Sequence, residues 1–268
     1  MITVKYIDTI DGIKDLIFEQ TYNEAIDRTR SSYFYRGMRN ADYELVTSLQ
    51  RNCKDASEEL EQPLLENFIN YVRNEDPTIN ESIWKAMVIG QHYGLPTRLL
   101  DWTHSTLVAL HFANAEDNLD KLAQRNCVVW RIDLRDLNRS LPQKYKDYLE
   151  RKNTFVFPLD GLTEIASDLP QYDADMGEHA MVCFEPPSID QRIANQYSFF
   201  SAVPSGIDDL ETFLNEHTDN TVKYIIDKRL RWELRDILDQ FNINERMILP
   251  GKTGIAKWLA RHYYVKNK

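Results

Sequence analysis

Hydrophobic and polar positions alternate in two distinct ways along the first half of the chain. Residues 2–7 alternate with a period of two, and residues 33–37 begin with a continuous aromatic run, so both segments predict strands. Apolar positions at helical spacing predict one helix over about residues 11–26 and two more between residues 56 and 90. Residues 107–113 are apolar on nearly every side, which predicts a helix that is buried all round.

The second half shows a different balance of elements. Strands are predicted at residues 127–134, 155–158, 180–187 and 222–227, with a final strand and turn at residues 244–254. Helices are predicted around residues 230–238 and 255–264. Because helices crowd the first half and regular strand–helix alternation is missing, we expect an α+β fold. In it, a helix-rich N-terminal half packs on a mixed, mainly antiparallel sheet. Repeats and Gly/Ser linkers are absent, so residues 1–268 are expected to form one domain.

Composition narrows the classes of protein that the chain can belong to. It has 268 residues, a hydrophobic content of 43% and a formal charge of −10, so a core of ordinary size is available and a role in coating nucleic acid is disfavoured. The three cysteines predict neither a disulfide framework nor a zinc knuckle. With no long apolar run and no signal-like start, we expect a cytoplasmic protein without membrane contact.

Familiar catalytic motifs are missing from the sequence. It contains no GxGxxG, HExxH, CxxC or GxSxG pattern. The triplet Gly251-Lys252-Thr253 has Arg246 where a phosphate loop needs glycine, which favours a simple turn. His92, His104 and His111 are not spaced as paired metal ligands on a helix, so no metal is expected.

Polar residues crowd the segment 91–106, directly before the apolar helix. Burying Arg98 or Asp101 without a partner would cost several kcal/mol, so each should be paired or should face a pocket. One interpretation is a structural ion pair of Asp101 with Arg98 or with Arg36. The other is an anion or ribose site, because guanidinium groups suit phosphate and amide or hydroxyl groups suit sugar hydroxyls. Its members would be Arg36, Gln91, Thr97 and Arg98.

Two long stretches, residues 33–52 and 90–114, closely resemble the signature blocks of the FRG domain family, which is named after a Phe/Tyr-Arg-Gly motif. Residues 192–202 are a weaker match. In the closing segment 244–259, Ile-Leu-Pro stands where the family has an aromatic residue, and Gly-Lys-Thr stands where it has acidic residues. The resemblance covers about residues 30–262.

Shorter stretches are similar to ADP-ribosyltransferases of the Arg-Ser-Glu type. Tyr35-Arg36-Gly37 ends an aromatic strand, residues 103–113 carry a Ser/Thr-rich start and an apolar helix, and Glu245 precedes the apolar run 247–250. This similarity implies an ADP-ribosyltransferase-like fold with NAD as substrate and no metal.

The same similarity implies roles for individual residues. Arg36 and Glu245 would be catalytic, Arg36 by contacting the phosphate or ribose of NAD and Glu245 by binding the ribose 2′-hydroxyl, with Glu185 in reserve. Further cofactor-binding candidates are Gln91, His92, Tyr93, Thr97, Arg98, Ser105 and Thr106, with Trp102 as a second ring partner. Candidates for reading the acceptor are Gln91, His92, Arg98, Asp101 and Gln196.

The implied activity is a mono-ADP-ribosyltransferase, an intracellular bacterial toxin or phage-defence effector that modifies a protein or a nucleic acid and that could have an antitoxin protein as partner. A non-catalytic nucleotide- or ligand-sensing module is the first alternative. The second is a nuclease in which a divalent ion is held by Asp101, Glu185 or Asp190. A nucleic-acid substrate would need a local basic groove, for which the candidates are Arg36, Arg39, Arg51 and Arg98.

Overall fold

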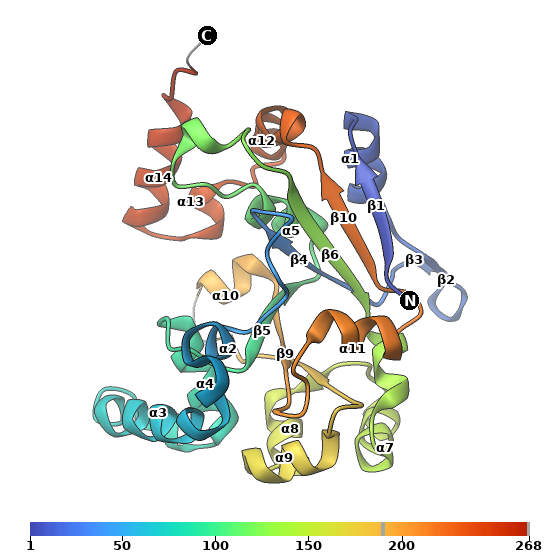
Figure 1. Cartoon of the computed structure of the whole chain (residues 1–268), viewed down its shortest axis with the longest axis vertical. Helices are drawn as coiled ribbons and strands as arrows, with labels where there is room; N and C mark the ends of the chain where they lie inside the picture. The colour runs from blue at the N-terminus through green and yellow to red at the C-terminus, as the bar shows by residue number, and fades with distance from the viewer. Residues whose placement is uncertain (189–190, 267–268) are drawn as a thin grey trace.

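The fold is built on one large sheet, seen in the computed structural model of the chain (Figure 1), which describes residues 1–188 and 191–266. Its strands, in spatial order, are β1 (Thr3–Ile7), β10 (Val222–Ile226), β6 (Cys127–Asp133), β4 (Tyr33–Met38), β5 (Leu99–Thr103), β9 (Ser198–Ala202), β8 (Val182–Glu185) and β7 (Phe157–Pro158). The outermost pairs, β1 with β10 and β7 with β8, are parallel, and the inner pairs are antiparallel. The expected mixed, mainly antiparallel sheet is confirmed. A separate short hairpin joins β2 (Tyr22–Asn23) to β3 (Arg28–Thr29).

Helices surround this sheet from both halves of the chain. In the first half they are α1 (Ile10–Ile17), α2 (Ser48–Cys53), α3 (Ser57–Val72), α4 (Ile83–His92) and α5 (Thr106–Ala113). The later ones are α6 (Leu134–Leu137), α7 (Gln143–Lys152), α8 (Leu159–Ile165), α9 (Leu169–Met176), α10 (Gln191–Gln196), α11 (Leu210–His217), α12 (Arg231–Gln240), α13 (Glu245–Ile248) and α14 (Lys252–His262). The α+β class is confirmed, but the expectation that helices crowd the first half is wrong. Short helices such as α7, which buries Tyr145, Tyr148 and Leu149 among charged residues, have too little apolar pattern to be recognised.

Helix α5 lies against β4 and anchors the centre of the fold. Ala109 and Leu110 pack with Tyr35 and Val129 in one core cluster, as expected of a helix buried all round. The contact is so close that a Cβ atom at Gly37 would lie 1.8 Å from the carbonyl oxygen of Ala109. Gly37 is therefore required by the packing of a helix on its strand.

Three sequence expectations are corrected by the fold. The segment 244–254 does not form a strand: Asn244 accepts a hydrogen bond from the backbone N–H of Met247 and starts helix α13. Helix α1 ends at Ile17, so Ile26 is not part of it. Residues 99–103, for which no strand was predicted, form strand β5; Leu99 and Leu100 are adjacent and both buried, so its apolar residues do not alternate.

Candidate ligand-binding cleft

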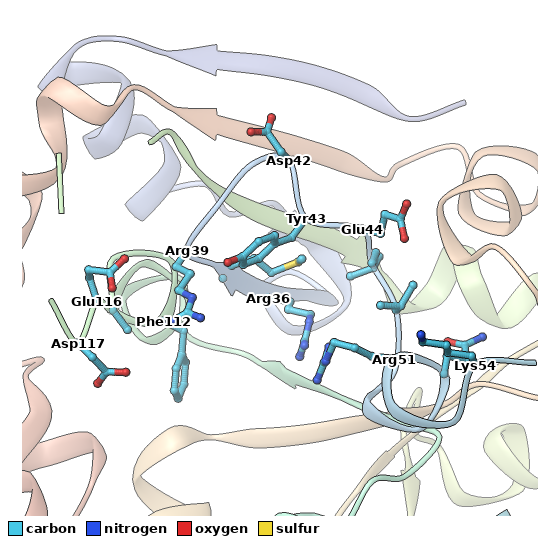
Figure 2. A pocket seen from close by; sticks show the side chains of 16 residues that line it. Arg36, Arg39, Asp42, Tyr43, Glu44, Arg51, Lys54, Phe112, Glu116 and Asp117 are labelled. Atoms are coloured by element: carbon cyan, nitrogen blue, oxygen red, sulfur yellow. The ribbon is translucent and has the colours of Figure 1, made fainter. Parts of the chain in front are cut away.

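The sheet opens between its two central strands. β4 and β5 pair at a single position, Tyr35 opposite Thr103. Beyond that pair β4 stays with β6 over its whole length, whereas β5 stays with β9. A cleft of about 980 Å³ lies at this side of β4, walled by the end of β4, the segment that leads into α2, and the residues at the end of α5 (Figure 2).

Arg36 on β4 reaches across the opening toward β5. Its Nη1 donates to the carbonyl oxygen of Asp101 at 2.8 Å and lies 3.5 Å from Oδ2 of the same residue, so the predicted ion pair of Arg36 with Asp101 is confirmed. The Arg36 side chain is 21% exposed, and its Nε is buried without a hydrogen-bond partner in the described part of the chain. Burial lowers the pKa of Arg36; Asp101 acts in the opposite direction, and the nearby positive charge of Arg51 lowers the pKa further. Two guanidinium groups close to each other make this end of the cleft attractive to an anion.

The cleft has a basic end and a mainly acidic end. Figure 2 shows Arg36, Arg51 and Lys54 together at one end, and Glu116 and Asp117 at the other, where Arg39 lies beside Glu116. Arg51 and Lys54 have no acidic partner within residues 1–188 and 191–266. The aromatic rings of Tyr43 and Phe112 also line the cleft. This separation of charge is suited to a ligand that carries phosphate at one end and a ring or a positive charge at the other.

A hydrogen-bonded network fixes β5 beside Arg36. Gln91 Nε2 donates to Asp101 Oδ2 at 3.2 Å and to the carbonyl oxygen of Leu99 at 3.4 Å, and Gln91 Oε1 accepts from the hydroxyl of Thr97. The Ser48 hydroxyl closes the network against the backbone of Thr97. Gln91, positioned by Thr97, thus holds Asp101 and the strand that receives the guanidinium of Arg36.

One known protein family is similar to the segment that forms the cleft. Residues 31–121 match the FRG domain. This segment of the chain is similar to the FRG domain. Every residue that lines the cleft, from Arg36 to Asp117, falls inside the matched segment. No curated protein and no solved structure matches the chain at a significant level.

The second arginine of the FRG signature, Arg98, has a different environment from Arg36. Its side chain is 6% exposed, and its Nε donates to Glu61 at 2.8 and 2.9 Å, while Nη1 bonds Asp173. Burial acts to lower the pKa of Arg98, but Glu61 and Asp173 more than offset it and raise the pKa overall. Both predictions for Arg98, the ion pair with Asp101 and the anion site, are therefore wrong, because other carboxylates occupy its guanidinium.

Ser105 and Thr106 lie at the start of α5, inside the segment that matches the FRG domain. Ser105 Oγ accepts from the backbone N–H of Val108 at 3.3 Å and caps the helix. Thr106 is buried and lies beside the hydroxyl of Tyr35 on β4. His92 and the exposed Tyr93 lie at the end of α4, ring against ring, outside the lining of the cleft.

Glu245, expected beside Arg36, is held elsewhere. It starts helix α13, and its Oε1 accepts from Arg261 Nε at 2.7 Å; Arg261 also bonds Asp239 of α12. Burial acts to raise the pKa of Glu245, and the bonds from Arg261 more than compensate, so the pKa is lowered. Glu245 does not line the cleft in the described chain.

The remaining candidate residues are spread over the sheet. Gln196 Nε2 donates to the carbonyl oxygen of Ile248 at 3.1 Å and ties α10 to α13. Glu185 ends β8, and β9 separates that strand from β5 and Asp101. Asp190 lies outside the described residues. Among those that are described, no group of three or more His, Cys, Asp or Glu is placed to hold a metal ion, and no helix has the length and apolar character needed to cross a bilayer.

Sequence reasoning missed several residues of the cleft. Lys54, Tyr43 and Phe112 were not recognised, nor were Glu116 and Asp117. Glu116 and Asp117 come shortly after the buried helix α5, whose end is fixed in space. Their closeness to this helix was the feature of the sequence that could have indicated them.

Proposed function

We propose that the cleft binds NAD and that the protein transfers ADP-ribose from NAD to a macromolecular acceptor. The observation that supports this most is the placement of Arg36 where the sheet opens, at the basic end of a cleft whose other end is acidic. NAD has the matching distribution of charge, with an anionic pyrophosphate and a cationic nicotinamide ring.

In this proposal Arg36, Arg51 and Lys54 bind the pyrophosphate. Guanidinium groups form paired hydrogen bonds with phosphate oxygens, and Lys54 adds a point charge. The ring of Phe112 packs against the nicotinamide. Gln91 and Asp101 keep the guanidinium of Arg36 in place, which preserves the geometry that the bound ligand requires.

The proposed reaction breaks one bond and forms one. The bond between ribose C1′ and the nicotinamide nitrogen breaks, and its electron pair leaves with nicotinamide, which becomes neutral. The acceptor nucleophile then forms a bond to C1′ and releases a proton to water. Positive charge builds up at the ribose in between, so a carboxylate close to C1′ lowers the barrier.

Glu116 is the carboxylate that we assign to this role. It lines the acidic end of the cleft beside Phe112 and is partly buried. Glu245 was the candidate from sequence, but the strand context on which it was chosen is absent and its carboxylate binds Arg261.

The cellular setting remains part of the proposal. An enzyme of this kind would act in the cytoplasm as a bacterial toxin or phage-defence effector, with an antitoxin protein as a possible partner. These assignments rest on the resemblance of the sequence to ADP-ribosyltransferases.

Labelled NAD tests the activity. Purified protein is incubated with adenylate-labelled NAD and cell lysate, with and without EDTA, and both nicotinamide release and labelled macromolecules are measured. Transfer that persists in EDTA supports the proposal. NAD binding without nicotinamide release would instead indicate a sensing module, and lysate nucleic acid cut only without EDTA would indicate a nuclease.

A further inference from the structure

A second, smaller pocket adjoins the cleft. It has a volume of about 220 Å³ and shares Arg39, Tyr43 and Glu116 with the cleft. Its outer wall comes from Lys121 and Arg125, in the connection between α5 and β6, and its floor includes Arg231 of α12.

Arg231 is an unusual buried charge. It is 1% exposed, and burial lowers its pKa. Its Nε donates to Asn114 Oδ1 at 3.0 Å, Nη1 to the carbonyl oxygens of Arg39 and Arg125 at 3.3 and 3.1 Å, and Nη2 to that of Ala113 at 3.2 Å. All of these acceptors are neutral. The pocket floor therefore holds a fixed positive charge that no carboxylate neutralises through a hydrogen bond within the described residues.

Three exposed cations stand around this floor. The side chains of Arg39, Lys121 and Arg125 have no acidic partner in the described chain, and Glu116 is the acidic residue among those that line the pocket. Arg231 holds the backbone at two of these residues, because its Nη1 donates to the carbonyl oxygens of Arg39 and Arg125. Four cations around a small pocket with one carboxylate favour the binding of an anion.

We infer that this second pocket binds the phosphate of a nucleoside phosphate, with the base on the ring of Tyr43. The volume fits one phosphate and its sugar, and a tyrosine ring beside a basic pocket is a stacking surface for any base. The net charge of −10 opposes tracking of a long duplex, so either a free nucleotide or the end of a strand supplies the phosphate.

This inference deepens the proposed function and rests on it in one respect. If Glu116 stands at ribose C1′ of NAD, the second pocket meets the cleft at that carboxylate, because both share Glu116 and the second pocket contains none of Arg36, Arg51 and Lys54. The group bound there is then the acceptor, and the acceptor is a nucleotide or a nucleic-acid terminus. The binding of phosphate itself does not depend on turnover of NAD.

Binding without NAD tests the pocket directly. The probe is a 3′-labelled single-stranded hexanucleotide that carries either a 5′-phosphate or a 5′-hydroxyl, and affinity is measured by fluorescence anisotropy. The variant is Lys121→Ala/Arg125→Ala. The matched control is Arg28→Ala/Arg73→Ala, which removes the same charge from two exposed arginines elsewhere.

We expect the 5′-phosphate to raise affinity about tenfold in the wild-type protein and in the control, and this gain to vanish in Lys121→Ala/Arg125→Ala. Competition by AMP would identify a free nucleotide as the source, and failure of AMP to compete would identify the strand end. Equal affinity for both probes, or a gain that survives in Lys121→Ala/Arg125→Ala, overturns the inference.

Arg36→Ala separates this test from the proposed function. A phosphate gain that persists in Arg36→Ala, together with no NAD turnover in the wild-type protein, would keep the pocket and reject the transferase. A gain lost in Arg36→Ala but kept in Lys121→Ala/Arg125→Ala would place the phosphate in the main cleft and reject the second pocket.

Discussion

The negative charge of Glu61 neutralises Arg98 inside the protein, and removing that charge should lower the free energy of unfolding. The pair is buried, with side-chain exposures of 5% for Glu61 and 6% for Arg98. We expect Glu61→Gln to lower the free energy of unfolding by about 3–5 kcal/mol, because Arg98 then lacks its main partner. Urea denaturation measures the loss, with the exposed Glu58→Gln as the control. A loss as small as that of the control would show that Arg98 does not depend on Glu61.

Arg36 and Arg98 show how much about the partners of a single residue could be predicted from the sequence. The sequence indicated that both arginines needed a partner or a pocket. It could not show that Glu61 and Asp173 bind Arg98, because they are 37 and 75 positions from Arg98 and come close only in the folded chain. Asp101 is close in sequence to Arg98 but pairs with Arg36.

His111 makes stability depend on pH. Burial, with a smaller contribution from Arg235, lowers the pKa of His111 from 6.5 to about 3. The fold therefore holds the neutral ring, and its stabilising effect is complete above pH 6.5 and is lost as the pH falls toward 3. The wild-type protein should lose stability relative to His111→Gln by up to about 1.4 kcal/mol per pH unit in this range. Urea denaturation of both proteins at about pH 7 and about pH 5 measures this; a difference that stays constant would contradict it.

Glu116 and Glu245 can be distinguished as catalytic carboxylates by paired variants. We expect Glu116→Gln to lower the rate of nicotinamide release about a hundredfold with little change in stability. Glu245→Gln should mainly lower the melting temperature, since Glu245 joins α13 to α14 through Arg261. The reverse result, with Glu245→Gln inactive and Glu116→Gln active, would restore the assignment made from sequence.

At the level of elements, the contact between β4 and α5 shapes the cleft. Gly37→Ala would place a Cβ atom 1.8 Å from the Ala109 carbonyl oxygen and 2.5 Å from the Ala113 backbone nitrogen, and neither backbone atom can move freely. We expect a loss of about 3 kcal/mol in the free energy of unfolding, at the upper end of the usual range for overpacked cores. Gly12→Ala, whose nearest neighbour is the Ile7 side chain at 3.1 Å, is the control and should change stability by less than about 1 kcal/mol. Similar effects of both would show that α5 can shift away from β4.

Elements with a continuous apolar run were predictable, whereas β5 and α13 were not. The strand at β6 and the helix at α5 were recognised from their continuous apolar runs. β5 was missed because Leu99 and Leu100, adjacent in sequence, are buried on opposite faces. The segment with α13 was taken for a strand because Met247, Ile248 and Leu249 form a short apolar run, and only the cap at Asn244 favours a helix.

For the whole molecule, the α+β class followed from the sequence but the cleft did not. The FRG segment supplies β4 and β5 at the centre of the sheet, with β6 and β9 from later in the chain on either side. The cleft depends on where these two strands separate, and strand order is not encoded in local patterns. Its charged residues come from connections between elements, and a net charge of −10 gives no indication of a basic end.

The most direct test is a calorimetric titration of NAD into the wild-type protein and into Arg36→Ala. The control is Arg73→Ala, which removes an exposed arginine directly after the last residue of α3. We predict that Arg36→Ala weakens NAD binding at least about tenfold, because a charged hydrogen bond to phosphate is lost, while Arg73→Ala binds like the wild type. Equal affinity of all three proteins for NAD, or no binding by the wild type, would contradict the claim that the opening between β4 and β5 is an NAD site.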